Sequence, residues 1–346
     1  MNILVVNYEM DDDSVALAWQ IRVVRALAGR CDRVVVLTLR RGAGAVPANV
    51  TVETLAGPAG LPWLGKRLAR LRQAGRLCRQ YAVDAVFIHM AHQLAYELYP
   101  VFAARRLPVL LWYAHGTLSW HVRLAHACVD RVVTSTPEGF RIASPKRHII
   151  GQGVDTDLFT LRPRAPAARE ILVVSRISRR KRLALLLEVS EHLRADGLRL
   201  VIVGAPLTEA DRRYQAELQA VIAQRALPVT LAGFVPLAAI PPLYENAVAH
   251  LSLSQTNSLD KSLLEALACG CPALTSNPAF QSLLAPFPGL FITDEQPAAI
   301  AAQVRAVLAR PADFAPPALR ALIVGHHDLG SYTECLLEHL HALRAR

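Results

Sequence analysis

Short runs of apolar residues alternate along the chain with segments in which apolar residues recur at helical spacing. Residues 2–6 form the first run, helical spacing follows over residues 16–27, and residues 34–39 form the next run. Uninterrupted apolar runs of this length are typical of strands that are buried on both faces. The order strand, helix, strand therefore predicts a parallel sheet covered by helices. Further strands are expected at residues 84–88, 108–112 and 130–135.

A second series of the same kind follows a change in composition. Residues 162–168 are rich in Pro, Arg and Ala without periodicity, which favours a linker. Beyond them we expect strands at residues 171–176, 198–204, 229–231, 247–253 and 290–292, and helices at residues 240–247, 298–309 and 331–343. The length of 346 residues also suits two domains better than one. The pattern predicts an α/β fold with two Rossmann-like domains, at residues 1–160 and 161–330, and a terminal helix at residues 331–346.

The most informative stretch is the loop and helix that follow the strand at residues 247–253. Residues 255–258 are polar, and the apolar positions after them recur at helical spacing, at Leu259, Leu263, Leu264 and Leu267. Gly270 ends the predicted helix, and Pro272 lies just beyond it. The start of such a helix presents unpaired backbone N–H groups, which bind anions well.

The end of this helix, Glu265-Ala-Leu-Ala-Cys-Gly-Cys-Pro272, resembles the signature of family 4 glycosyltransferases. The family's earlier Glu is replaced by Asn257, and residues 256–261 resemble a variant found in bacterial members. The resemblance covers nearly the whole chain and is most specific over residues 171–277. It implies two Rossmann-like domains facing across a cleft (the GT-B fold), a nucleotide diphosphate sugar as donor, and transfer of a hexosyl-type sugar with retention of configuration. It also implies a role in the synthesis of bacterial cell-surface polysaccharide or glycolipid, with a sugar or lipid-linked acceptor.

The resemblance further implies a donor site in the second domain. Arg176 and Lys181 match the residues that hold the donor's diphosphate, and Glu265 matches the residue that holds its ribose. The start of the helix would contribute Asn257, Ser258, Leu259, Asp260 and Lys261, and the base would lie against Gly233, Phe234 and Val235. A guanidinium and an ammonium that converge on a phosphate stabilise the charge of a leaving diphosphate. The alternative is a solvated basic turn, because Arg179, Arg180 and Arg182 are close by.

A histidine follows one of the strands of the first domain. His115 comes after the predicted strand 108–112 and before Gly116, so we expect it at the carboxyl end of the sheet, where doubly wound folds bind ligands. In the family a His at this place lies beside the transferred sugar, so His115 is a predicted active-site residue. His89 and His92 at the preceding strand are weaker candidates. The resemblance places the acceptor in this domain.

Neither a cofactor nor a metal ion is expected. The loop after the first strand lacks the glycines of a dinucleotide fingerprint. Asp11, Asp12 and Asp13 could form a metal cluster, but a solvated loop with helix-capping charge explains them better. Asp155-Thr-Asp157 matches the Asp-x-Asp motif of other glycosyltransferases, but it lies in the predicted interdomain stretch rather than after a strand, so we do not interpret it as a metal site.

The composition of the chain indicates the cellular compartment in which the protein is expected. Hydrophobic residues make up 53% of the chain and charged residues 19%, so a large core is expected. No apolar run is long enough to cross a membrane, and the first residues do not resemble a signal peptide. The six cysteines lack zinc-type spacing. These features predict a cytoplasmic protein with reduced thiols.

The positive charge is concentrated in the first half of the chain. Of the net charge of +10, residues 1–150 contribute +9. Residues 61–80 contain six basic residues and no acid, with a tryptophan at the start and leucines that can share one face, namely Leu64, Leu68, Leu71 and Leu77. This pattern is compatible with a peripheral contact with an anionic membrane at its inner face, and no nucleic acid partner is expected. An ordinary surface helix is the alternative.

Two other functions are compatible with the same pattern. One is a nucleotide-sugar epimerase of the same architecture, which would need a carboxylate or histidine pair facing the sugar. The other is a non-catalytic descendant of the fold that binds lipid or nucleic acid, because Asn257 replaces the family's first Glu. Transfer of a sugar by the purified protein would distinguish both from a transferase.

Overall fold

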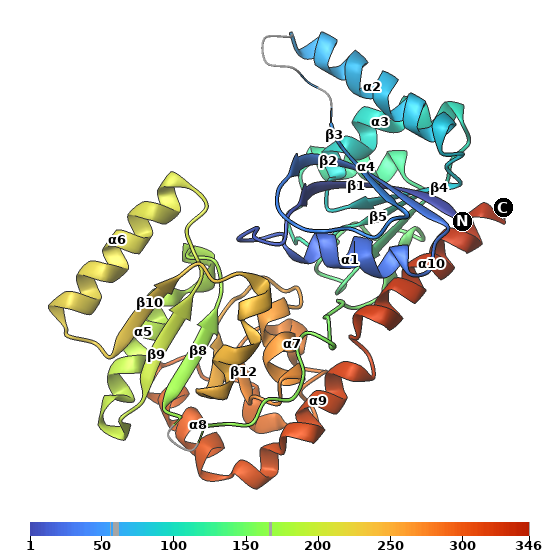
Figure 1. Cartoon of the computed structure of the whole chain (residues 1–346). Helices are drawn as coiled ribbons and strands as arrows, with labels where there is room; N and C mark the ends of the chain where they lie inside the picture. Colours follow the sequence, from blue (N-terminus) through green and yellow to red (C-terminus); the bar gives the residue numbers. More distant parts are fainter. Residues whose placement is uncertain (56, 58–61, 166–167, 346) are drawn as a thin grey trace. The chain divides into compact units, whose positions relative to one another are not determined.

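The computed structural model describes residues 1–55, 57, 62–165 and 168–345, and these divide into two compact units. Unit 1 comprises Met1–Gly153 and Leu329–Arg346, and unit 2 comprises Val154–Asp328 (Figure 1). The C-terminal segment therefore belongs to the same unit as the N-terminus.

Unit 1 contains a parallel sheet with the strand order β3-β2-β1-β4-β5-β6-β7. Its central strands are buried along nearly their whole length, which explains their uninterrupted apolar sequences. The strand bounds are β1 Asn2–Met10, β2 Arg33–Arg41, β3 Val50–Thr54, β4 Ala85–His89, β5 Val109–Trp112, β6 Arg131–Thr134 and β7 Arg147–Ile149.

Helices cover both faces of this sheet. Successive residues of β1 point to opposite faces, so Ile3 packs with helices α1 and α10 while Leu4 packs with α2, α3 and α4. Figure 1 shows the first pair below the sheet and the other three above it. The helix bounds are α1 Trp19–Ala28, α2 Trp63–Gln80, α3 His92–Ala104, α4 Trp120–Cys128 and α10 Leu329–Arg344.

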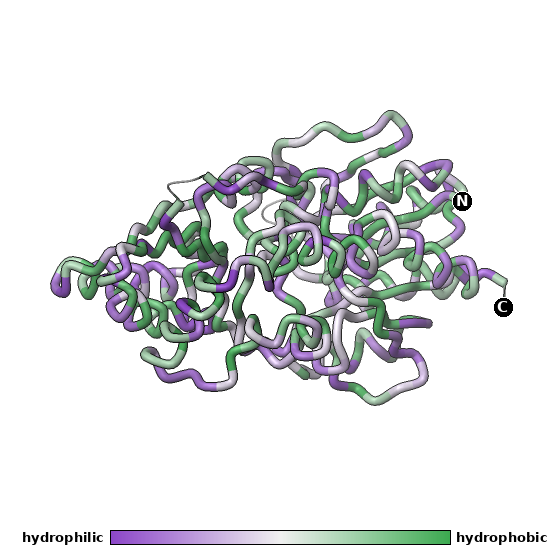
Figure 2. The backbone as a smooth tube through the Cα atoms, turned by 90° about the horizontal axis from the view of Figure 1, so that it is seen from below, coloured by the Kyte–Doolittle hydropathy of each residue, from purple (hydrophilic) through white to green (hydrophobic). Residues whose placement is uncertain are grey.

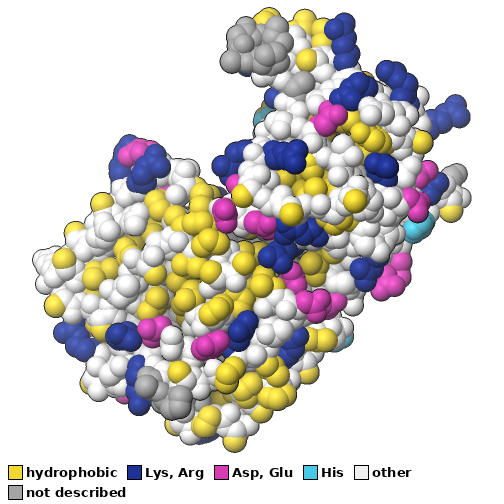
Figure 3. Space-filling model, viewed as in Figure 1, with side chains coloured by type: hydrophobic (Ala, Val, Ile, Leu, Met, Phe, Trp, Pro, Cys, Tyr) yellow, Lys and Arg dark blue, Asp and Glu magenta, His cyan; other side chains and the backbone are white. Residues whose placement is uncertain are grey.

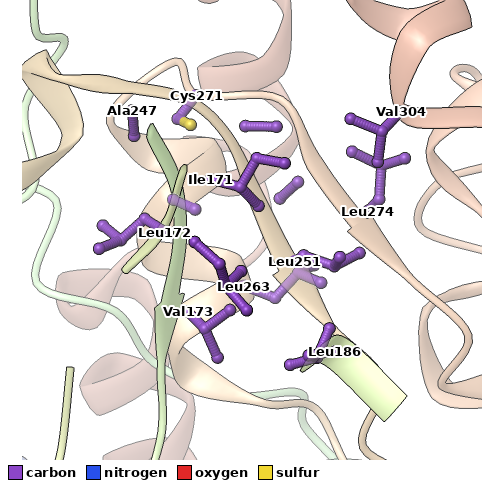
Figure 4. Packing of buried hydrophobic residues seen from close by; sticks show 14 of the residues in the cluster. Ile171, Leu172, Val173, Leu186, Ala247, Leu251, Leu263, Cys271, Leu274 and Val304 are labelled. Atoms are coloured by element: carbon purple, nitrogen blue, oxygen red, sulfur yellow. The ribbon is translucent and has the colours of Figure 1, made fainter. Parts of the chain in front are cut away.

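Unit 2 contains a second parallel sheet, with the order β10-β9-β8-β11-β12. One hydrophobic core joins the sheet to its helices, and Figure 4 shows Leu172 of β8, Leu251 of β11 and Leu263 of α7 within it. The strands are β8 Glu170–Val174, β9 Arg199–Val203, β10 Val229–Gly233, β11 Ala247–Ser252 and β12 Ala273–Thr275. The helices are α5 Leu183–His192, α6 Glu209–Gln224, α7 Lys261–Ala268, α8 Pro297–Ala309 and α9 Pro316–Val324.

The predicted fold class is confirmed, because both units are α/β with parallel sheets. Hydrophobic and hydrophilic stretches alternate along the backbone in both (Figure 2). No helix of the described residues is long and apolar enough to span a membrane. Of the predicted linker, residues 166 and 167 lie outside the described residues, and the remainder belongs to unit 2.

Several predicted elements were wrong in detail. The segment predicted as a helix at residues 240–247 is a 3-10 turn over Pro241–Glu245. A capped helix start is also expected at residues 136–139, but there the Thr136 hydroxyl accepts a hydrogen bond from the Gly139 N–H and closes a turn. The strand expected at residues 290–292 is a single bridge between Thr275 and Phe291.

Candidate donor site in unit 2

The carboxyl ends of three neighbouring strands of unit 2 are held close together by a glycine. Gly204 follows β9 with φ of +146°, and a Cβ atom there would lie 2.0 Å from the carbonyl oxygen of Ser175, which follows β8. The Gly204 N–H donates to the carbonyl of Gly233 at the end of β10, at 2.8 Å. Only glycine permits this approach. The close packing places Arg176 and the segment after β10 at the sheet edge where doubly wound folds bind ligands.

Lys181 reaches from the segment after β8 to the start of α7. Its ammonium lies 2.8 Å from a carboxylate oxygen of Asp260 and 3.5 Å from the Ser254 hydroxyl. Asp260 precedes the first residue of α7 and also accepts a hydrogen bond of 3.3 Å from Ser252. The ion pair therefore fixes Lys181 beside the loop that joins β11 to α7. Asp260 acts here as a counter-ion of Lys181, a role that the sequence pattern did not reveal.

The loop before α7 is held in place by its own polar side chains. The Thr256 hydroxyl lies 3.4 Å from that of Ser254 and 3.3 Å from that of Ser258. Asn277, after β12, donates from its side chain to the Ser258 carbonyl at 2.9 Å. Asn257 has φ of +55°, a left-handed conformation that Asn tolerates better than most residues. Leu259 packs partly against the core of unit 2. These contacts connect the loop to the end of β11, to Asn277 and to the core of unit 2.

Lys261 and Glu265 lie one turn apart in α7. Burial raises the pKa of Glu265, and the nearby Lys261 ammonium opposes that rise. Burial also lowers the pKa of Lys261, while Glu265 raises it. Lys261 is the first residue of α7, where the helix dipole disfavours a cation. An anionic group bound at this end of α7 would offset the cost of placing a lysine there.

Arg176 differs from the other arginines of its segment. Arg179 pairs with Glu217 at 2.6 Å, and Arg182 pairs with Glu295 at the same distance. Arg176 is exposed directly after β8 and has no ion-pair partner among the residues that the structure describes. The paired arginines fit the alternative of a solvated basic turn, whereas Arg176 forms no ion pair there and only lies close enough to Asp211 to help lower the pKa of that carboxyl.

The residues after β10 offer a surface for a planar group. Gly233 has φ of +77° and no atom within 4 Å of the position of a Cβ, so the backbone there is open. Phe234 is exposed, and Val235 packs partly against the core. An exposed ring beside an open glycine backbone can stack on a base.

The histidines of unit 1 have different surroundings. His115 is exposed after β5, and its backbone N–H donates to the Gly139 carbonyl at 3.0 Å. His92 lies against Tyr113, with 5.1 Å between ring centroids, and burial lowers its pKa. His89 is fully buried with Trp19 and Trp112 at ring-centroid distances of 4.1 and 5.4 Å. His89 is therefore part of the packed core of unit 1.

The acidic residues considered as metal ligands have other partners. Asp12 binds the Arg25 guanidinium with two hydrogen bonds, of 2.8 and 2.6 Å. Asp11 accepts backbone N–H groups of Asp13 and Ala43, and Asp155 accepts that of Leu158. Within the described ranges, no three His, Cys, Asp or Glu side chains are grouped closely enough to hold a metal ion.

Comparison with known proteins connects this geometry to a family. Residues 162–321 match the family model described as glycosyl transferases group 1. The matched segment contains Arg176, Lys181, the loop before α7 and Glu265. The predicted resemblance is therefore confirmed as a match of this segment to group 1 glycosyl transferases. Membership of family 4 and retention of configuration stay predictions. No curated protein sequence matches the chain.

Solved glycosyltransferase structures have the same fold over the whole length. HepE from Anabaena, in complex with UDP and glucose, has a TM-score of 0.80 and 17% identity, covering 98% of both chains. A glycosyltransferase from Rickettsia africae has a TM-score of 0.79 and 15% identity, covering 99% of this chain and 98% of that one. Sucrose-phosphate synthase from Thermosynechococcus elongatus has a TM-score of 0.75 and 16% identity, covering 99% of each. The shared GT-B fold is thus shown for the whole chain.

Proposed function

We propose that the protein is a retaining glycosyltransferase that moves a sugar from a nucleotide diphosphate sugar to an acceptor hydroxyl. The observation that supports this most directly is the cationic edge of unit 2. Lys181 is fixed by Asp260 beside the start of α7, and Arg176 is exposed at the neighbouring strand end without an ion pair in the described part of the chain. Cations and a helix start at one sheet edge suit a diphosphate.

In the proposed reaction the bond between the sugar's anomeric carbon and the diphosphate breaks as the acceptor hydroxyl attacks. Negative charge then builds on the leaving diphosphate. Arg176, Lys181 and backbone N–H groups at residues 257–259 stabilise this charge, which is the role that a metal ion has in other enzymes. The resemblance to retaining transferases implies attack from the same face, with the hydroxyl proton passing to a phosphate oxygen of the leaving group.

The remainder of the donor would lie along the same edge. Glu265, buried in α7, would accept hydrogen bonds from the ribose hydroxyls. Phe234 would stack on the base beside Gly233 and Val235. HepE was solved with UDP and with UDP-glucose, so a uridine nucleotide is the first donor to test. We assign His115 and the acceptor to unit 1, with His115 near the transferred sugar.

Purified protein and UDP-glucose, with a series of sugar and lipid-linked acceptors, test this function. We expect UDP release that depends on the acceptor and a product whose anomeric configuration, followed by proton NMR, equals that of the donor. Inverted product would contradict retention. Isomerisation of the sugar with no acceptor would indicate an epimerase, and no consumption of any nucleotide sugar would support a binding protein.

A further inference from the structure

Unit 1 exposes two tryptophans and several leucines at the starts of α2 and α4. The Trp63 and Trp120 side chains are 72% and 65% exposed, although indole rings are usually largely buried. Leu64 and Leu68 are exposed beside Trp63, and Leu118 and Leu124 are exposed near Trp120. We call these six residues the tryptophan face. An apolar group of this size on a surface indicates a binding partner.

Contacts through α3 connect the two halves of the tryptophan face. The Tyr96 ring lies 6.3 Å from Trp120, and the Tyr96 hydroxyl is 2.8 Å from Nδ1 of His121. On the other side, the Arg67 guanidinium lies 5.6 Å over the Trp63 ring. Burial raises the pKa of the Tyr96 hydroxyl and Glu97 adds to this, while Arg67 is close enough to oppose it. Trp120 is thus in contact with α3, which packs between α2 and α4, while Trp63 and Arg67 lie at the start of α2.

The exposed apolar stripe of α2 is shorter than the sequence suggests. Only its first half, Leu64 and Leu68, is exposed. Leu71 packs partly against the core, and Leu77 is fully buried in it. Beyond its second turn, the leucine-bearing face of α2 therefore packs against the core of unit 1, as in an ordinary surface helix. Any contact with a partner involves the beginning of the helix, where the tryptophan lies.

The charges of this region favour an anionic partner. Residues 54–80 and 98–129 contain no Asp or Glu. Arg70 pairs with Glu97 at 2.9 Å and Arg76 pairs with Glu53 at 2.6 Å, so these two are neutralised within the unit. Lys66, Arg67 and Arg123 lie beside the tryptophan face with no ion-pair partner in the described residues. Hydrophobic and basic side chains adjoin each other where α2 begins (Figure 3).

From these observations we infer that the tryptophan face binds the surface of an anionic phospholipid bilayer. The Trp63 and Trp120 rings lie at the level of the headgroups, where indoles are favoured, and Lys66, Arg67 and Arg123 lie against lipid phosphates. Tryptophans, leucines and unpaired cations without acids suit this partner better than a protein surface. The inference deepens the proposed function, because helices α2 and α4 follow the carboxyl ends of β3 and β5, the same sheet edge as His115. A lipid-linked acceptor would then be presented at that edge.

Co-sedimentation of the full chain with vesicles tests the inference without donor or acceptor. Phosphatidylglycerol vesicles are expected to bind the protein at low salt, with a blue shift of tryptophan fluorescence, and phosphatidylcholine vesicles at least tenfold less. Binding should weaken as salt rises, because surface charges are screened. Trp63→Ala with Trp120→Ala, and separately Lys66→Glu with Arg67→Glu, should each lower the partition coefficient at least tenfold.

Matched controls lie in unit 2. Arg212→Glu with Arg213→Glu makes the same change of charge on exposed residues of α6, and Leu207→Ala removes another exposed apolar side chain. Both should bind as the wild type does. Equal binding to both vesicle types, no binding, or unchanged binding of the face variants would overturn the inference. So would a dimer in solution that Trp63→Ala dissociates, since a second copy would then cover the face. Titration with UDP tests the donor site separately, so either idea can fail without the other.

Discussion

The cations at the carboxyl-end edges of the two sheets are partnered differently. In unit 2, Lys181 is paired with Asp260 and the hydroxyls of the adjoining loop contact one another, while Arg176 has no ion pair in the described residues. In unit 1, the Arg67 guanidinium lies over the exposed Trp63 ring, and neither Arg67 nor Lys66 has an ion pair in the described residues. A prearranged edge suits a small ligand of fixed shape, and an open edge suits a large and fluid one. The difference supports a donor site in unit 2 and a surface contact in unit 1.

The largest expected effect concerns the backbone that shapes the unit 2 edge. Gly204→Ala should destabilise unit 2 by about 3 kcal/mol, because the new Cβ meets the Ser175 carbonyl at a left-handed φ. Gly197→Ala is the control, since its φ is also positive but no atom lies within 4 Å of the Cβ, and it should cost about 1 kcal/mol. Urea unfolding measures both. Equal losses would show that the close approach at Gly204 does not matter.

A buried histidine makes the stability of unit 2 depend on pH. Burial lowers the pKa of His250 to about 3, and Lys181 adds to this while Asp260 opposes it. The folded protein keeps this histidine neutral, but the unfolded chain takes up a proton below its ordinary pKa near 6.5. The neutral His250 therefore contributes its full stabilisation above pH 6.5, and this contribution is lost as the pH falls below that value. Between pH 8 and pH 5, His250 alone should lower the free energy of unfolding by about 2 kcal/mol.

The His250→Phe variant separates this contribution from others. Urea unfolding at pH 8, 6 and 5 should show a smaller loss toward acid pH than in the wild type, whatever the stability at pH 8. His339 of unit 1, whose pKa burial lowers to about 4, should still contribute its own loss in the variant. An unchanged pH dependence would mean that His250 is solvated in solution.

The sequence predicted most strands correctly because burial on both faces leaves uninterrupted apolar runs. It did not indicate β3, an edge strand with mixed residues, or α6, in which only Tyr214 and Leu218 are buried. The pairing of Lys181 with Asp260 joins positions 79 residues apart, and only the packing of β8 beside β11 brings them together. Gly204 follows a predicted strand, but the need for glycine depends on Ser175 of the neighbouring strand. The contacts that define the unit 2 edge therefore depend on tertiary packing.

A smaller effect should distinguish Glu265 from other acids of unit 2. Glu265→Ala should weaken UDP binding by about fivefold, since the ribose would lose hydrogen bonds worth about 1 kcal/mol net. Glu217→Ala removes an exposed acid that pairs with Arg179 and should leave the affinity unchanged. Isothermal titration compares the two. If both variants bind UDP like the wild type, Glu265 has a structural role only.

Removal of divalent metal should have the smallest effect. The positive charges of unit 2 would replace a metal ion at the diphosphate, so sugar transfer should proceed at the same rate in excess EDTA. Initial rates with EDTA, and after addition of magnesium or manganese, measure this. Loss of activity with EDTA and recovery with either metal would contradict the proposed mechanism.

Titration of the protein with UDP tests the central claim, that cations at the carboxyl edge of unit 2 hold the donor's diphosphate. We predict that Arg176→Ala and Lys181→Ala each weaken UDP binding at least tenfold, because each loses charge-assisted bonds worth about 1.5–3 kcal/mol. Arg179→Ala, whose guanidinium pairs with Glu217, should bind UDP like the wild type. Uridine alone should bind weakly to all of them. Equal affinity of the wild type and the Arg176 and Lys181 variants for UDP would contradict the claim.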